Sequence, residues 1–258
     1  MGFGAFTSYF DVAQVVLYAF WIFFAGLIIY LRREDKREGY PLESDRSQRS
    51  ARVKLQGFPR MPSSKSFTMP DGSTVTVPRA PDSQELAARP LEPWPGAPLE
   101  PTGNPMLDGV GPASYAHRAN VPDLTFEGHP RIVPMRQAAD FTVSKYDPDP
   151  RGMAVLGGDG QQGGVVSDLW VDVAEPQIRY VEVMLNSGTH RVLVPIGFVR
   201  IDKRRRVARV RSILGAQFAS APVLASPEQI TRAEEDRVCA YYGGGTLYAH
   251  NDRVEPLL

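Results

Sequence analysis

The chain has 258 residues, enough for one large domain or two small ones with accessory segments. Its formal net charge is zero and 22% of its residues are charged, which excludes the overall basic field of a general nucleic-acid-binding protein. The single cysteine, Cys239, excludes an internal disulfide framework and a zinc site with several cysteines. Because the four histidines lie far apart in the sequence, we expect no metal held by this chain alone.

The first predicted element is an apolar run of twenty residues, 12–31, interrupted only by Gln14. A helix of this length rises roughly 30 Å, the thickness of the hydrocarbon core of a bilayer. A secretory signal peptide would begin with basic residues and end in a cleavage site of small residues. Here residues 1–11 contain no Lys or Arg, and the run is followed directly by four basic residues, Arg32, Arg33, Lys36 and Arg37. The pattern predicts a single transmembrane helix with a periplasmic N-terminus, 1–11, and the main domain in the cytoplasm.

Residues 32–112 are predicted to form an extended, proline-rich cytoplasmic segment. Twelve prolines between Pro59 and Pro112 remove backbone donors and fix φ, so a long helix or a central strand is excluded here. One hairpin is predicted, with strands 66–69 and 74–77. Apolar side chains spaced along the segment indicate that it is laid against a partner: Phe67, Leu91, Trp94, Leu99, Met106 and Leu107.

Residues 113–258 are predicted to form a β domain with a C-terminal helix. Short alternating segments are bounded by tight turns, at 131–135, 154–156, 164–172, 178–185, 190–195, 199–201 and 207–210. Since no helical pattern separates them, they indicate a small antiparallel β-barrel. The fold class is therefore mainly β, with one N-terminal transmembrane helix.

The C-terminal helix is predicted from a capping box, Ser226-Pro227-Glu228-Gln229, and the same signal recurs at 231–234. The helix is expected to end near the glycines at 243–245. Cys239 lies within it among apolar residues, so we expect a buried, unreactive thiol rather than a nucleophile.

Two groups of ionisable residues are dense enough in the sequence to form a functional cluster. The first contains five residues within fifteen positions: Asp168, Asp172, Glu175, Arg179 and Glu182. Strand alternation puts Asp168 and Asp172 on one face, and Arg179 can pair with Asp172 or Glu175. The second group is Asp123, Glu127, His129 and Arg131. The alternatives are a solvated strand edge with surface ion pairs for the first group and an isolated surface histidine for the second.

Several long sequence strings occur together in this chain. They are FDVAQ at 10–14, FWIFFAGLIIYL at 20–31, REGYPLE at 37–43, PTGNPMLDGVGPASY at 101–115, IVPMR at 132–136, DLWVD at 168–172, RYVEV at 179–183 and EEDRVCAYYGGGTLYA at 234–249. Over almost its full length the chain resembles the H subunits of purple bacterial photosynthetic reaction centres. The barrel portion is also similar to the wider PRC-barrel family.

The resemblance implies a subunit that caps the cytoplasmic face of the L and M subunits and helps conduct protons to the secondary quinone. The complex is the light-driven enzyme, and this subunit is not itself a catalyst. It implies that the partner subunits hold the bacteriochlorophyll, bacteriopheophytin, quinones and non-haem iron, and that this chain binds no cofactor alone. The implied location is the inner, intracytoplasmic photosynthetic membrane, beside a light-harvesting antenna ring and membrane lipids, with no nucleic acid partner.

The resemblance also assigns proton-transfer roles to individual residues. Glu175 matches the acidic residue next to the secondary quinone, with Arg179 beside it, and Asp172 belongs to the same group. In the second group His129 fits the family pattern, whereas Glu127 stands where a histidine is often found and Thr125 replaces an acidic residue. A paired-histidine site for proton uptake is therefore not expected.

Two other functions are compatible with parts of the sequence. One is a membrane-tethered adaptor that uses a PRC-barrel to bind proteins outside photosynthesis. The other is a stand-alone enzyme, for which the sequence offers no nucleophile elbow, phosphate loop or metal motif. Co-purification with pigment-bearing subunits would indicate a reaction-centre subunit, and a colourless monomer would indicate the adaptor.

Overall fold

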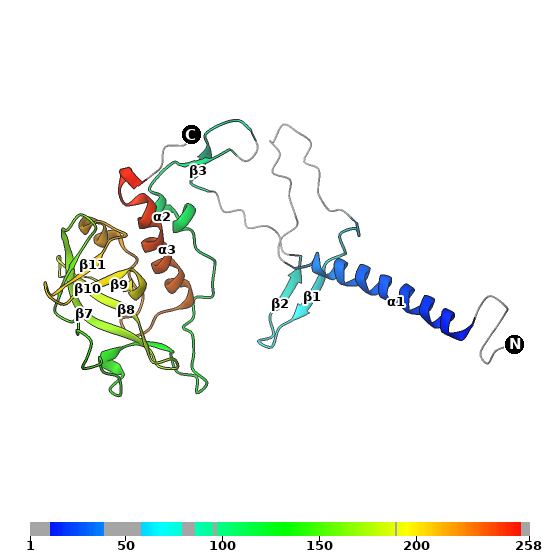
Figure 1. The fold of residues 1–258 in the computed structure, drawn as a ribbon, viewed down its shortest axis with the longest axis horizontal. Coiled ribbons are helices and arrows are strands. Elements are labelled where there is room, and N and C mark those ends of the chain that lie inside the picture. Colours follow the sequence, from blue (N-terminus) through cyan, green and yellow to red (C-terminus); the bar gives the residue numbers. More distant parts are fainter. Residues whose placement is uncertain (1–10, 39–57, 79–85, 95–96, 189, 254–258) are drawn as a thin grey trace. The chain divides into compact units, whose positions relative to one another are not determined.

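The computed structural model describes residues 11–38, 58–78, 86–94, 97–188 and 190–253 (Figure 1). The chain divides into two compact units. One consists of residues 1–85 and 92–97, and the other of residues 86–91 and 98–258.

In the first unit the apolar run forms helix α1 (Val12–Asp35). Asp11 caps it by accepting a hydrogen bond from the Gln14 backbone N–H, while the Gln14 side chain accepts one from Asp11. The helix continues past position 31, because Arg32 and Arg33 are good helix formers and their charges suit a helix C-terminus. None of its residues is buried, and its length and apolar composition suffice to cross a membrane.

The chain after α1 folds back onto the end of this helix. β1 (Lys65–Thr68) and β2 (Thr74–Val77) form the predicted antiparallel hairpin, with Lys65 opposite Val77. The Lys65 ammonium lies 3.0 Å from the Glu34 carboxylate, and the Lys36 ammonium donates to the Pro59 carbonyl. These bonds attach the hairpin to the C-terminal turn of α1.

The second unit contains a seven-stranded sheet that matches the predicted strands. Its members are β5 (Ile132–Pro134), β6 (Ala154–Leu156), β7 (Gln162–Asp172), β8 (Gln177–Leu185), β9 (Arg191–Pro195), β10 (Val199–Asp202) and β11 (Val207–Val210). The order is β10-β11-β6-β7-β8-β9, and β5 pairs with β7. All pairs are antiparallel except β6 with β11, which the sequence did not predict. Within the described residues no ladder joins the two outer strands, β9 and β10. The predicted fold class is confirmed, and the domain is mainly β.

The end of the proline-rich segment adds small elements to this unit. β3 (Ala88–Pro90) pairs with β4 (Leu99–Pro101), and α2 (Pro105–Asp108) and the 3-10 turn η1 (Gly111–Ala113) follow. Of the apolar residues predicted to contact a partner, Met106 is buried within the chain. The other five remain exposed: Phe67, Leu91, Trp94, Leu99 and Leu107.

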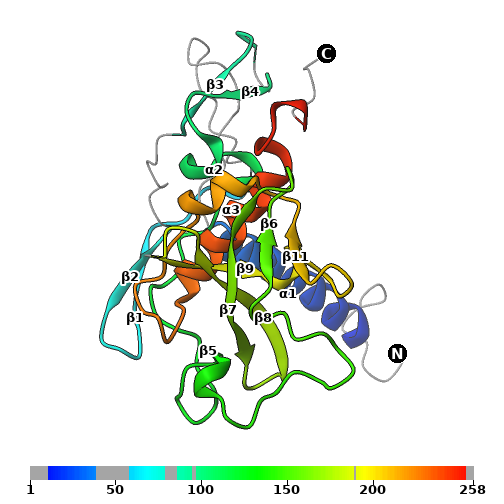
Figure 2. The same ribbon diagram turned by 90° about the vertical axis from the view of Figure 1, so that its left-hand side faces the viewer.

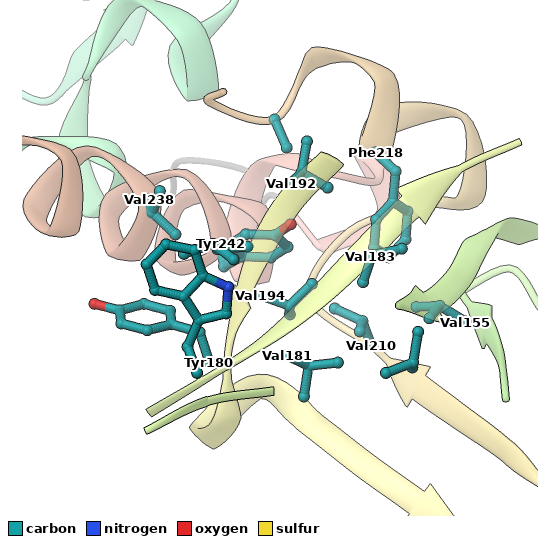
Figure 3. Close-up of a cluster of buried hydrophobic side chains, with 14 of the residues drawn as sticks. Val155, Tyr180, Val181, Val183, Val192, Val194, Val210, Phe218, Val238 and Tyr242 are labelled. Atoms are coloured by element: carbon teal, nitrogen blue, oxygen red, sulfur yellow. The ribbon is translucent and has the colours of Figure 1, made fainter. Parts of the chain in front are cut away.

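The core of the second unit lies between the sheet and the C-terminal helix. Figure 3 shows valines of β8 and β9, including Val181 and Val194, beside Val210 of β11. Phe218 from the 3-10 segment η4 (Gly215–Ser220) and Tyr242 from the helix cover them. Each fully buried side chain of this size contributes roughly 1.5–3 kcal/mol through the hydrophobic effect.

The C-terminal helix α3 (Arg232–Tyr248) packs beside β9 (Figure 2) and begins later than the first capping signal predicted. Its N-cap is Thr231, whose hydroxyl accepts from the Glu234 N–H while the Glu234 carboxylate accepts from the Thr231 N–H. The predicted start at Ser226 is wrong. The Ser226 hydroxyl accepts a bond from the Glu228 N–H at 3.3 Å, but residues 226–230 form no helical turn and the helix begins only after Thr231.

The predicted end of the helix near 243–245 is also wrong. α3 continues through these glycines to Tyr248 because they permit close packing. A Cβ on Gly244 would lie 2.5 Å from the Cβ of Ala113 in η1, and one on Gly245 would lie 2.6 Å from the Ser212 carbonyl oxygen. Here the glycines allow the helix to approach its neighbours rather than ending it.

Cys239 lies on α3, as predicted, but it is exposed rather than buried. Desolvation by neighbouring side chains nevertheless raises the pKa of its thiol, and the carboxylates of Glu235 and Asp236 add to this effect. A raised thiol pKa agrees with the expected low reactivity.

Candidate proton-transfer site

Arg131 connects the two ionisable groups that the sequence presents separately. It directly precedes β5, and the pairing of β5 with β7 sets Ile132 opposite Asp172. In this register the Arg131 Nε lies 2.9 Å and 2.8 Å from the two carboxylate oxygens of Asp172. A terminal nitrogen of the same guanidinium lies 2.9 Å from Glu175 Oε1. One arginine therefore holds two carboxylates from the end of β7 and the turn that follows it.

Asp172 is buried and fully hydrogen-bonded. Its side chain is 1% exposed, and its Oδ1 also accepts from the backbone N–H groups of Ala174 and Glu175, each at 3.0 Å. Burial alone would raise the pKa of this carboxyl, but the hydrogen bonds from Arg131 and the backbone outweigh it. The pKa of Asp172 therefore lies below its ordinary value, and the group is a fixed negative charge at neutral pH.

Glu175 is the solvent-facing end of the same cluster. It lies in the turn between β7 and β8, and its side chain is 67% exposed. Apart from its ion pair with Arg131, it accepts a hydrogen bond from the Gln177 side chain at 3.3 Å. Its position leaves it available to a group outside this chain.

Arg179 contributes to the site through Asp172 rather than Glu175. Of the two pairings that the sequence left open, the structure contains the one with Asp172, at 3.9 Å. Arg179 also lies 4.0 Å from the carboxylate of Glu235 on α3. Glu235 accepts a hydrogen bond from the Tyr180 hydroxyl at 2.9 Å, and burial raises the pKa of its carboxyl. Sequence reasoning missed Glu235, because only the packing of α3 brings it near β8.

Asp123 and Arg131 form the base of a short loop that projects from the domain. The Arg131 N–H donates to the Asp123 carbonyl, and the Thr125 N–H donates to the His129 carbonyl. The Asp123 carboxylate lies 2.6 Å from an Arg232 nitrogen and 3.8 Å from Arg131. The hydrogen bond from Arg232 keeps the pKa of Asp123 below its ordinary value.

Glu127 and His129 lie on this loop, and both are exposed. Hydrogen bonds from the Glu127 backbone N–H and the Thr125 hydroxyl lower the pKa of Glu127, with a smaller contribution from the charge of His129. Within the described residues, no direct hydrogen bond or ion pair joins either side chain to Arg131. The structure thus divides the second predicted group: Glu127 and His129 are in solvent, Arg131 contacts Asp172, and Asp123 contacts Arg131 and Arg232.

Asp168 and Glu182 belong to a separate buried network. The Arg136 guanidinium lies 3.0 Å from both carboxylates, and Glu182 also accepts from Ser167 at 2.7 Å and from the Trp170 indole at 3.1 Å. The two acidic residues face each other across β7 and β8. Both carboxylates are nearly inaccessible to solvent, and the network joins β7 and β8 through Arg136.

Two known protein families match different parts of this chain. Residues 143–214 match the PRC-barrel domain family, and this range contains strands β6 to β11 of the sheet. Residues 4–137, more than half of the chain, match the family described as photosynthetic reaction centre, H-chain N-terminal region. The chain belongs to the photosynthetic reaction centre H-chain family. Together with the apolar helix α1, this fits a membrane-anchored subunit of a reaction-centre complex.

The Arg131 site spans both matched regions. Arg131 and the loop 124–130 belong to the first, and Asp172 and Glu175 belong to the second. The site therefore forms only when the two regions fold together.

Proposed function

We propose that this chain caps the cytoplasmic face of the pigment-bearing L and M subunits and helps deliver protons to the secondary quinone. The observation that supports this most is the Arg131 cluster. It links an exposed carboxylate, Glu175, to a buried charge, Asp172, and to Asp123 at the base of an exposed acidic loop. Membership of the H-chain family favours this role over a membrane-tethered adaptor outside photosynthesis.

The chemistry of quinone reduction sets the requirement. Conversion of a quinone to a quinol consumes two electrons and two protons, and a quinone buried in a protein is sealed from bulk water. Protons then have to pass along ionisable side chains and water molecules. A group at the inner end of such a path needs to be accessible from the partner subunit, and Glu175 meets this condition in the described structure.

Each residue of the cluster has a distinct role in this proposal. Glu127 and His129, on the exposed loop, form the solvent end of the path, where the lowered pKa of Glu127 keeps it charged and able to attract protons. Asp172 stays ionised, and its charge stabilises a proton that arrives nearby. Arg131 and Arg179 hold the carboxylates in place and limit the accumulated negative charge. Glu175 passes the proton on to the quinone site of the partner.

A second route runs toward α3. Arg179 lies between Asp172 and Glu235, and burial raises the pKa of Glu235. A carboxyl with a raised pKa can hold a proton closer to neutral pH than an exposed one. Glu235 therefore acts as a reserve donor beside the main cluster.

Attachment to the complex uses the other parts of the chain. The helix α1 spans the inner membrane with its N-terminus in the periplasm, and the exposed Arg32 and Arg33 of its last turn face anionic lipid headgroups. The exposed apolar side chains of the proline-rich segment contact L and M, which hold the bacteriochlorophyll, bacteriopheophytin, quinones and iron. In the membrane, the light-harvesting antenna ring surrounds the complex that contains α1.

The proposal is tested by flash-induced absorbance kinetics on the purified complex. Glu175→Gln keeps the shape of the side chain and removes the ionisable group, so the proton-coupled second electron transfer to the secondary quinone should slow by about tenfold or more. Primary charge separation should not change. The matched control is Glu228→Gln, which removes an exposed carboxylate outside the cluster and should leave both steps unchanged. A wild-type second transfer in Glu175→Gln, with wild-type pH dependence, would contradict the role of this residue.

A further inference from the structure

The β10–β11 hairpin concentrates positive charge that the proposed function does not use. Residues 200–211 contain seven arginines and lysines and one acidic residue, in a chain with a formal net charge of zero. Arg200 and Arg209 are direct partners across the two strands. Like charges in such a cross-strand pair destabilise a sheet. Arg200 also lines the groove described next, so an anion bound there would offset part of this repulsion.

A shallow groove of about 400 Å³ lies beside this hairpin, and three of its seven lining residues are arginines. It is formed by Gly197, Phe198, Arg200, Arg211, Ser212, Thr246 and Arg253. Arg200 and Arg211 are exposed, and within the described residues neither has a carboxylate within 4 Å. This is the reverse of the Arg131 site, where the chain supplies its own carboxylates.

Two further features of the groove point to a ligand. Ser212 is 5% exposed, and within the described residues its hydroxyl is buried without a hydrogen-bond partner. A buried hydroxyl of this kind costs free energy unless a partner satisfies it. Arg253 donates to the carbonyls of Arg211, Ser212 and Gly245, which fixes its guanidinium against the wall of the groove. The positive charge of Arg253 is therefore held in place before any ligand arrives.

We propose that this groove binds a phosphate group, carried either by a soluble phosphate compound or by a phospholipid headgroup. The guanidinium groups of Arg200 and Arg211 donate to phosphate oxygens, with a geometry for which arginine is well suited. The Ser212 hydroxyl donates a further bond after rotation about χ1. Three arginines around one groove match an anion with more than one negative charge. The inference stands independently of proton delivery, since it shares no residue with that site.

The site is tested by isothermal titration of the full chain, in detergent micelles, with inorganic pyrophosphate as the probe. We expect saturable binding that becomes about tenfold weaker in Arg211→Gln, the effect of one charge-assisted hydrogen bond. Ser212→Ala should weaken binding by about threefold. The control is Arg206→Gln, which removes the same charge from the hairpin turn but does not line the groove. Equal losses in Arg211→Gln and Arg206→Gln would overturn the proposal, because they would show a general charge effect.

A second measurement identifies the source of the phosphate. The full chain is placed in nanodiscs of phosphatidylcholine alone or with phosphatidate, and hydrogen exchange is followed at Arg211 and Ser212. Protection by phosphatidate, absent in Arg211→Gln, assigns the site to a lipid headgroup. Pyrophosphate binding without such protection assigns it to a soluble compound. The absence of both overturns the proposal.

Discussion

Replacement of Asp172 by Asn tests whether the buried charge holds the site together. Asn retains an oxygen that can accept from the backbone N–H groups of Ala174 and Glu175. In the wild type the Arg131 Nε contacts both carboxylate oxygens of Asp172 within 2.9 Å. The Asn amide nitrogen would replace one of these acceptors with a second donor. Loss of these charge-assisted bonds should lower the free energy of unfolding by about 2–3 kcal/mol. At a urea m-value of about 2 kcal/mol/M, the midpoint falls by about 1–1.5 M.

The pH dependence of this effect has a definite sign. The pKa of Asp172 is lowered in the folded chain, so its contribution to stability is present above the unfolded carboxyl pKa of about 3.9. The contribution is lost as the pH falls through the folded value. The difference between wild type and Asp172→Asn should therefore stay constant from about pH 8 to pH 5 and shrink below about pH 4.

The assay is urea unfolding of the full chain in detergent micelles, followed by near-ultraviolet circular dichroism of the buried Trp170 and Tyr180. Glu175→Gln is the matched control, because its exposed ion pair with Arg131 should contribute only about 0.5 kcal/mol. An unchanged midpoint in Asp172→Asn at pH 7 would refute this reasoning. A difference that grows as the pH falls below 4 would refute it as well.

Other consequences can be checked on the same protein. Thr231→Ala removes the N-cap of α3 and should cost about 1 kcal/mol in unfolding free energy, while Ser226→Ala should cost no more than a few tenths. Equal effects of the two would contradict the helix start at Arg232. Protease added to sealed inside-out vesicles should release the main domain. Protection of the main domain in these vesicles would contradict the proposed orientation. Residues 90–115 should exchange amide hydrogens more slowly in the complex than in the isolated chain, whereas equal rates would show that this segment needs no partner.

The elements that the sequence predicted correctly are those with a local signal. The twenty-residue apolar run predicts α1 from its length alone. The alternation of residues 164–172 and 178–185 predicts β7 and β8, although the structure buries consecutive residues at 168–172 and 180–183. The hairpin of β1 and β2 follows from the turn at Pro70 to Gly72.

The features that the sequence did not predict depend on contacts between distant residues. Arg131 and Asp172 are 41 positions apart, and only the register of β5 against β7 brings them together. The glycines at 243–245 indicate a helix end by local rules, but tight packing against Ala113 explains them in the structure. The parallel pairing of β6 with β11 likewise has no local signal. The acidic residues of the site were thus identifiable by type, but their partners were not.

The most direct test of proton delivery is the rate of proton uptake by the complex after the second flash, measured with a pH-indicator dye. In Glu175→Gln, proton uptake and the second electron transfer should slow together, and Asp172→Asn should slow both less. Glu228→Gln should leave both at the wild-type rate. Wild-type proton uptake in Glu175→Gln would contradict the account, because it would show that protons reach the secondary quinone without this carboxylate.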